Sequence, residues 1–245
     1  MKFRLRLLCL HLAASALVLS FVLGGFYLGW YHWPGWYLAV VTRVVLVMAG
    51  VDLALGPLLT FVIANPGKAR RVLARDIACI AAVQLLALGY GSVQLWNGRP
   101  LYYAFSGGIL QLVQAYDLDP EDVRLARDKG TDFAPHWYSL PRWVYVPDPG
   151  LLSGGVGVTR PDFSTMPSYF KPWDQGLVEL RTRLAAIDAS SYFIFNEKAA
   201  LKTRMQKAGF HPEQHNTLPM TGRGRPVLVV FDWSTLKIQA ILKPD

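Results

Sequence analysis

Cysteine is scarce in this sequence, and its scarcity excludes disulfide bonds as the main way of stabilising a small domain. Only two cysteines, Cys9 and Cys79, occur in 245 residues, and both lie in apolar stretches of the N-terminal part. Small domains stapled by disulfides carry several cysteines at short spacing. Residues 97–245 contain none. This part must therefore be held together by a hydrophobic core, and it cannot use a thiol nucleophile.

Acidic residues are almost absent from the first 96 residues, which contain only Asp52 and Asp76. The same segment contains eight basic residues and has a net charge of +6, so the remainder supplies only +2 of the chain's +8. A nucleic-acid-binding surface would need its Lys and Arg on the soluble part. The excess of basic residues in the first 96 residues is therefore read as a signal of how the chain is oriented in a membrane. We expect no nucleic-acid partner.

Three long apolar runs dominate the first 96 residues. They cover about residues 7–30, 44–64 and 77–96. Each reaches the roughly 20 residues that a helix needs to cross the hydrocarbon core of a bilayer. From Asn97 onwards, charged residues, Pro and Gly recur at the density of a soluble protein. We therefore predict a membrane domain over residues 1–96, with three transmembrane helices in the lipid bilayer, and a separate domain over residues 97–245.

Basic residues are distributed unevenly among the segments that flank these runs. They gather at the N-terminus and in the loop after the second run: Lys2, Arg4, Arg6, Lys68, Arg70, Arg71 and Arg75. The first loop, Tyr31–Tyr37, has no Lys or Arg and contains four Trp and Tyr residues. The positive-inside rule predicts that the N-terminus and the second loop face the cytoplasm, and that the aromatic loop and residues 97–245 lie on the opposite side. Arg43, at the edge of the second run, is an exception to this distribution of basic residues. Its long side chain can extend to the outer membrane–water interface.

Polar residues within the apolar runs form stripes at helical spacing. In the second run, small and polar residues recur three and four positions apart: Ala49, Asp52, Gly56 and Thr60. In the third run, the corresponding stripe is Ala81, Gln84, Ala87 and Gly91. Asp52 lies near the middle of its run, where an ionised carboxylate is costly by several kcal/mol. Pro57 predicts a kink and a freed backbone carbonyl nearby.

These stripes allow three interpretations. Small residues let helix backbones approach closely, and polar residues hydrogen-bond across the contact. Asp52 and Gln84 could bond to each other and lock a three-helix bundle. The same face could instead receive the transmembrane helix of a partner. An ion or proton path is a third alternative, for which three helices leave little room. We expect Cys9 and His11 to be packing residues.

Residues 97–245 show a mixture of strand and helix patterns, which predicts a small α+β domain. Strands are predicted over 99–105, 143–146, 226–231 and 236–242, with a short apolar run at 192–195. Helices are predicted over 120–128, 174–187 and 197–208. Asp119 is the expected N-cap of the first of these helices, and Gly209 the end of the last. A long loop rich in Gly, Ser and Pro covers residues 147–172.

No motif in this domain predicts catalysis. His211 and His215 lie four residues apart, but Pro212 disfavours the helix that would make them a metal pair. The segment 154–157 is rich in glycine but lacks the strand and helix of a phosphate loop, and the segment 222–225 lacks the Lys and hydroxyl of a Walker loop. No Gly-x-Ser-x-Gly elbow is present. We expect no enzymatic activity, no cofactor and no metal.

Several short motifs of the membrane part occur together in one known family. They are Met1–Arg6, Leu10–Leu12, Gly50–Thr60, Asn65–Lys68, Asp76, Gln84, Ala87, Tyr90–Gly91, Arg99–Pro100 and Phe105. This combination resembles the TfpX/TfpZ family of accessory proteins for type IV pilins, and it covers about the first 105 residues. The outer domain matches in length and layout.

The resemblance implies a membrane protein with three transmembrane α-helices followed by a small α+β periplasmic domain. It implies a multi-pass protein of the bacterial inner membrane that acts with its cognate major pilin, and with other pilus assembly proteins. Such an accessory, chaperone-like protein affects the stability of the pilin or the yield of pili. An alternative is a membrane-anchored periplasmic sensor or modulator. Its short cytoplasmic segments would require a partner protein for output.

Overall fold

The computed structural model describes residues 1–147, 162–183, 203, 205–211, 215–224, 226–232 and 234–243. The chain forms two compact units. The first consists of Met1–His32 and Val40–Gly98, and the second of Trp33–Ala39 and Arg99–Asp245. The predicted division before Asn97 differs from this in two respects. It assigned residues 33–39 to the membrane part, whereas the structure places them with the C-terminal domain. It also assigned Asn97 and Gly98 to the C-terminal domain, whereas they belong to the first unit.

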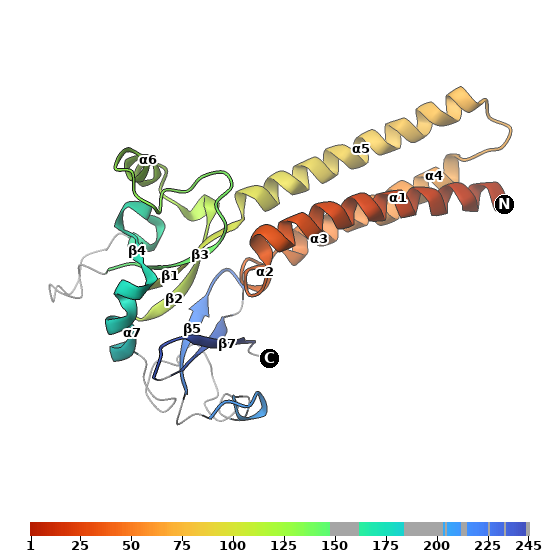
Figure 1. The fold of residues 1–245 in the computed structure, drawn as a ribbon. Coiled ribbons are helices and arrows are strands. Elements are labelled where there is room, and N and C mark those ends of the chain that lie inside the picture. Colours follow the sequence, from red (N-terminus) through yellow and green to blue (C-terminus); the bar gives the residue numbers. More distant parts are fainter. Residues whose placement is uncertain are drawn as a thin grey trace. The chain divides into compact units, whose positions relative to one another are not determined.

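The first unit consists of three long helical stretches (Figure 1). The first is α1 (Lys2–Phe26) continued by the π-helical turn η1 (Tyr27–Tyr31). The second is composed of α3 (Thr42–Ala49), the π-helical η2 (Gly50–Leu55) and α4 (Gly56–Ile63). The third is α5 (Arg70–Asn97). Within the described residues, these are the three helices long and apolar enough to cross a membrane.

The predicted runs lie inside these helices, apart from one residue at the end of the second. Helix α5 begins at Arg70, before the apolar run at Ile77. Helical hydrogen bonding continues into the basic segment because Arg and Leu are good helix formers. Lys68 precedes the helix and forms an ion pair with Asp76, with 3.0 Å between Nζ and Oδ2. Lys68 belongs to the predicted cytoplasmic loop after the second run, so this ion pair joins the loop to α5.

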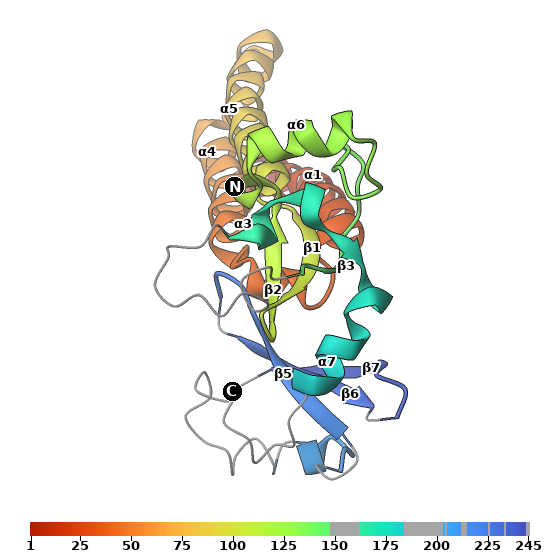
Figure 2. The ribbon, with the colours of Figure 1, turned by 90° about the vertical axis from the view of Figure 1, so that its left-hand side faces the viewer.

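Among the described residues, the second unit contains a seven-stranded sheet in the order β4-β3-β1-β2-β5-β6-β7 (Figure 1 and Figure 2). Its strands are β1 (Pro100–Ser106), β2 (Ile109–Gln114), β3 (Arg142–Tyr145), β4 (Lys171–Pro172), β5 (His215–Thr221), β6 (Val227–Asp232) and β7 (Ile238–Leu242). The β1–β3 and β2–β5 pairs are parallel, and the other pairs are antiparallel.

Short helices complete the second unit. They are α2 (Gly35–Leu38), η3 (Ala115–Asp117), α6 (Pro120–Asp128), η4 (Phe163–Thr165), η5 (Pro167–Tyr169), η6 (Trp173–Gly176) and α7 (Leu177–Arg183). The N-cap prediction is confirmed, because the Asp119 carboxylate accepts hydrogen bonds from the backbone N–H groups of Glu121 and Asp122 at 2.8 and 3.1 Å. The predicted helix at 174–187 begins as the 3₁₀ turn η6 before it becomes α7.

Most predicted strands are confirmed within two residues, as β1, β3, β6 and β7. Two longer strands were missed. Strand β2 follows Gly107 and Gly108, whose positive φ angles of 58° and 86° form a tight hairpin turn. Strand β5 contains Pro219 and several polar residues, so it lacks the alternation of a strand. The run at 192–195 and the segment 154–157 lie outside the described residues.

Both faces of β1 are buried in the core of this unit. Alternate side chains of a strand point to opposite faces. Tyr103 and Phe105 pack in one cluster, where Leu218 and Phe231 join them. Tyr102 and Ala104 face a second cluster, which includes Val144, Val146 and Phe170. Because neither face meets water, β1 reads as an almost continuous apolar strand, as central strands do.

The first loop between the apolar helices is part of this core. Leu38 is fully buried in the cluster that contains Tyr103 and Phe105. Its carbonyl accepts a hydrogen bond of 2.8 Å from the N–H of Gly224. A side chain at Gly222 would place its Cβ 2.8 Å from the same carbonyl oxygen, so this close approach requires glycine. The segment Trp33–Ala39 is therefore fixed to the domain by both packing and backbone contacts.

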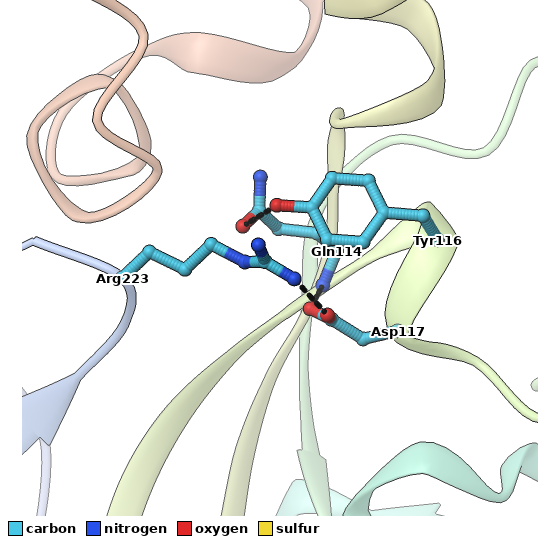
Figure 3. A network of polar contacts seen from close by, with 4 residues as sticks. All are labelled: Gln114, Tyr116, Asp117 and Arg223. Carbon is cyan, nitrogen blue, oxygen red and sulfur yellow. Dashed lines mark hydrogen bonds and ion pairs between the residues drawn. The ribbon is translucent and has the colours of Figure 1, made fainter.

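The tip of the β5–β6 hairpin also holds the turn that follows β2 (Figure 3). Arg223 forms an ion pair with Asp117, at 3.1 Å, and its guanidinium lies 4.3 Å from the centre of the Tyr116 ring. The Tyr116 hydroxyl donates to Gln114 Oε1 at 2.7 Å. Residues 222–224 of the segment that lacks Walker residues thus contact both Leu38 and the η3 turn.

Among the described residues, features at both edges of the sheet disfavour pairing with another strand. At one edge, the Trp33 indole N–H donates to the carbonyl of Ile241 in β7 at 3.2 Å, and Lys243 Nζ lies 5.6 Å from the Trp33 ring. At the other edge, β4 has only two residues, one of which is Pro172. Short edges, proline and covering segments are common devices that prevent strand addition. The sheet is thus poorly suited to binding a partner as an added strand.

We predict that Leu38→Ala destabilises the second unit even though the residue lies between two apolar helices in sequence. Removing a fully buried leucine costs about 2–5 kcal/mol. The full chain in detergent should therefore lose protease resistance of this unit at a lower temperature than the wild type. Leu140→Ala is the matched control because Leu140 is exposed. Equal melting of the two variants would contradict the role of the first loop in the core.

Candidate functional site

A polar chain joins the three helical stretches of the first unit. His11 lies in α1, and its Nδ1 is 2.6 Å from Thr60 Oγ1 in α4. Its Nε2 is 2.7 Å from Gln84 Oε1 in α5. One imidazole therefore links helices whose contact residues are 49 and 73 positions away in sequence. His11, expected to be a simple packing residue, lies at the centre of this network.

The Gln84 amide connects the same network to the backbone of η2. Its Nε2 donates to the backbone carbonyl of Asp52 at 3.0 Å and to Ser15 Oγ at 3.3 Å. A carbonyl only accepts, so the amide nitrogen must face Asp52 and Oε1 must face His11. Nε2 of His11 therefore carries a hydrogen. In the neutral imidazole, Nδ1 then accepts from the Thr60 hydroxyl.

The Asp52 carbonyl is available because its own helix cannot provide a donor. In the π-helical turn, the N–H of Gly56 bonds to the carbonyl of Val51, so it does not reach Asp52. The next residue, Pro57, has no N–H. A backbone carbonyl without a donor is costly in hydrocarbon. Gln84 supplies the missing hydrogen bond, and π-turns of this kind are frequent at functional sites.

This arrangement corrects the predicted link between Asp52 and Gln84. In the first of the three interpretations, the side chains of Asp52 and Gln84 bond to each other and so lock the bundle. In the structure, Gln84 bonds to the main chain of Asp52, which leaves the carboxylate out of the network. The physical reason is the combination of the π-turn with Pro57, which creates a stronger need for a donor at the carbonyl.

Two of the small residues in the predicted stripes lie at close helix contacts. A Cβ at Gly56 would lie 2.1 Å from Gln84 Nε2 and 2.3 Å from Cδ, so only glycine admits this amide. A Cβ at Gly91 would lie 2.5 Å from Met48 Cγ. Glycine permits such approaches between membrane helices. These two glycines of the stripes are thus used for contacts within the unit itself.

The structure divides the predicted contact residues between two places. The interior of the bundle contains Asp52, Gly56, Pro57, Thr60 and Gln84, all buried. Ala87 and Gly91 line a separate groove beside α3, with Met48 and Val47. Ala49 is half-buried. The network could have been suspected from His11 and Ser15, which are polar and four residues apart in the first apolar run.

A groove of about 190 Å³ opens beside the polar network. Its polar lining consists of His11, Ser15, Asp52 and Gln84, and its apolar lining of Ala14, Val18, Ala81, Leu85 and Leu88. Asp52 is only 5% exposed. Among the residues that the structure describes, no group of three His, Cys, Asp or Glu side chains could hold a metal ion.

We predict that Gln84→Leu destabilises the helical unit, because it leaves the Asp52 carbonyl without its donor and His11 Nε2 without its acceptor. Each orphaned polar group costs about 1–3 kcal/mol. The measurement is denaturant-induced unfolding of the full chain in detergent micelles. Gln94→Leu is the matched control, since Gln94 lies on the same helix and is exposed. Equal stability of the two variants would show that the amide is dispensable.

Comparison with known proteins shows similarity to fimbrial assembly proteins. No protein-family model matches this chain, and no solved structure is similar to it. Fimbrial assembly proteins of Dichelobacter nodosus, of serogroups I and E1, are each 23% identical to it over 231 residues, which span 91% of this chain and 88% of each relative. A third, of serogroups C1 and C2, is 27% identical over 109 residues, or 44% of this chain and 83% of that protein.

The similarity includes both units of the chain, because only about a tenth of the sequence lies outside the two long alignments. The part that contains His11, Asp52 and Gln84 and the part that contains the sheet are therefore related together to proteins of this kind. The similarity supports a relationship between this chain and the fimbrial assembly proteins of Dichelobacter nodosus.

Proposed function

We propose that this protein is a non-enzymatic accessory protein for type IV pilus assembly, similar to the TfpX/TfpZ proteins. It binds the cognate major pilin in the inner membrane and promotes or modulates the stability of the pilin and its assembly. The observation that carries the proposal is the similarity, over 91% of the chain, to proteins named for fimbrial assembly. The three long apolar helices support a place in the membrane.

The two-unit construction suits a subunit that is itself anchored in a membrane. Before assembly, a pilin is held by one apolar helix, with its globular head in the periplasm. An accessory with a helical unit and an outer domain can contact both parts. Two modest contacts on one tethered chain reinforce each other through effective concentration. Because both edges of the outer sheet are covered or short, we expect side chains rather than an added strand to contact the head.

The proposed orientation places the N-terminus and the loop at Lys68–Arg75 in the cytoplasm and the domain in the periplasm. Packing of Trp33–Ala39 with the domain supports it. Two of the three helices separate this segment from Arg99 in sequence, and two crossings return the chain to the same side. The first loop and the domain can therefore meet in water on one side of the bilayer, as the positive-inside rule requires.

We predict that two single-cysteine variants differ in their accessibility to a thiol reagent in cells. Cys9 and Cys79 are first replaced by alanine, and either Arg71→Cys or Lys129→Cys is added. With a membrane-impermeant thiol reagent and a permeabilised outer membrane, position 129 should be labelled at once, and position 71 only after the inner membrane is opened. Labelling of both positions from the periplasm would contradict the topology.

We predict that the tagged full chain, extracted in mild detergent, co-purifies with the cognate major pilin and not with an unrelated single-span protein. Deleting its gene should lower the amount of surface pili, and the wild-type gene should restore them. Measuring pilin in the membrane of the deletion strain separates the two modes, because a stabiliser lowers the total pilin and an assembly factor does not. Unchanged piliation after deletion would refute the proposed role.

A further inference from the structure

We propose that the groove beside Asp52 binds one transmembrane helix of a partner, and that this helix inserts a side chain with a hydrogen-bond donor toward the Asp52 carboxylate. The inference rests on the proposed function for the identity of the natural partner, a membrane-anchored pilus subunit. It adds the place of contact and the chemistry that the partner must offer. The groove lies between α1, η2 and α5.

The first observation is a carboxylate without a partner. The structure describes every residue of the helical unit, and within it no hydrogen bond or ion pair reaches the side-chain oxygens of Asp52. Yet the residue as a whole is only 5% exposed, and it lines the groove. The polar neighbours are already engaged, since both nitrogens of His11 and both polar atoms of the Gln84 amide form hydrogen bonds. The unit alone leaves the carboxylate unsatisfied.

The second observation is the setting of this group within an apolar helix. Charged and polar side chains in the hydrocarbon region are costly, and they face helix contacts where they find partners. Acyl chains of lipids cannot donate a hydrogen bond. A lipid that filled the groove would therefore cover its walls and leave Asp52 as it is. A helix that carries Asn, Gln, Ser, Thr, Lys or Trp at this depth would provide the donor.

The third observation is the size and lining of the groove. Ala14 and Ala81 flank it, and small side chains let a neighbouring helix come close. Its volume of about 190 Å³ is comparable with an engineered cavity of about 150 Å³ that admits benzene. It can hold one side chain and not a helix. The partner helix therefore lies along α1 and α5 and inserts a single residue.

A second groove, beside Arg43, does not carry the same argument. It has a volume of about 410 Å³, and Val47, Met48, Ala87 and Gly91 form much of its wall. Its polar residues, Arg43, Tyr90 and Gln94, are exposed, and no buried carboxylate faces it. Acyl chains therefore cover its apolar lining as well as a helix would. The groove beside Asp52 is distinguished by a group that lipid cannot satisfy.

The test uses the full chain in lipid bilayers and two synthetic transmembrane peptides of about 20 Leu and Ala residues, long enough to span the hydrocarbon core. One peptide carries a single central Asn, and the other Leu at the same position. Energy transfer between labelled peptide and labelled protein measures binding. We expect the Asn peptide to bind the wild type about five- to thirty-fold more tightly, the range of one interhelical hydrogen bond in model peptides.

Variants of the groove sharpen this test. Asp52→Leu should remove the preference for the Asn peptide. Asp52→Asn should keep part of it, because the side-chain carbonyl still accepts. Ala14→Leu and Ala81→Leu should block binding. Ala13→Leu and Ala82→Leu should not, because these exposed neighbours point away from the groove lining. An Asp52 that is paired with an ion, or that no partner helix reaches, predicts equal binding of both peptides, and that result would overturn the inference.

Capture of the pilin by the same variants separates this inference from the proposed function. If the wild type captures pilin and Asp52→Leu captures it equally well, the proposed binding site in the groove is refuted and the proposed function is supported. If the Asn peptide is preferred but no pilin is captured, the binding site is supported and the pilin is refuted as its partner.

Discussion

A single carbonyl oxygen governs the arrangement of the helical unit. The π-turn at Gly50–Leu55 directs the Gly56 N–H to Val51, and Pro57 has no N–H, so the Asp52 carbonyl needs a donor from another helix. Gln84 provides it. The amide reaches this position only because Gly56 has no side chain. Once the amide is oriented, it fixes the tautomer of His11, and through His11 the contact with Thr60. One missing backbone donor thus determines how all three helices meet.

The same constraint leaves the carboxylate of Asp52 without a partner. The only amide close to it is committed to the main chain, and the imidazole is committed to Thr60 and Gln84. A chain that needed only a stable anchor would be served as well by an apolar residue at this position, because burying an acid in hydrocarbon is unfavourable. The presence of an acid beside an apolar groove is more readily understood if the helices bind another membrane segment than if they only anchor the domain.

The first loop imposes a second constraint, on the order in which the parts can form. Leu38 belongs to the core of the sheet domain, and Trp33 covers part of the β7 edge. The core is therefore incomplete until the loop between the first two helices has joined the domain. In the proposed topology, this requirement couples folding of the domain to membrane insertion of the helices, although the contacting residues lie far apart in the sequence. The contacts of Arg223 with Asp117 and Tyr116 hold the neighbouring β5–β6 hairpin in place (Figure 3).

Local patterns in the sequence were sufficient for the three apolar helices, the Asp119 cap and strands such as β1 and β6, because length, apolarity and periodicity are properties of contiguous residues. They were sufficient also to single out Asp52, Gly56 and Gln84. They could not show that Gln84 would bond to a carbonyl rather than a carboxylate, that His11 would join three helices, or that residues 33–39 would enter the core. Those outcomes depend on residues 32 or more positions apart meeting in space. Only the packed structure decides which of several chemically suitable partners a polar group obtains.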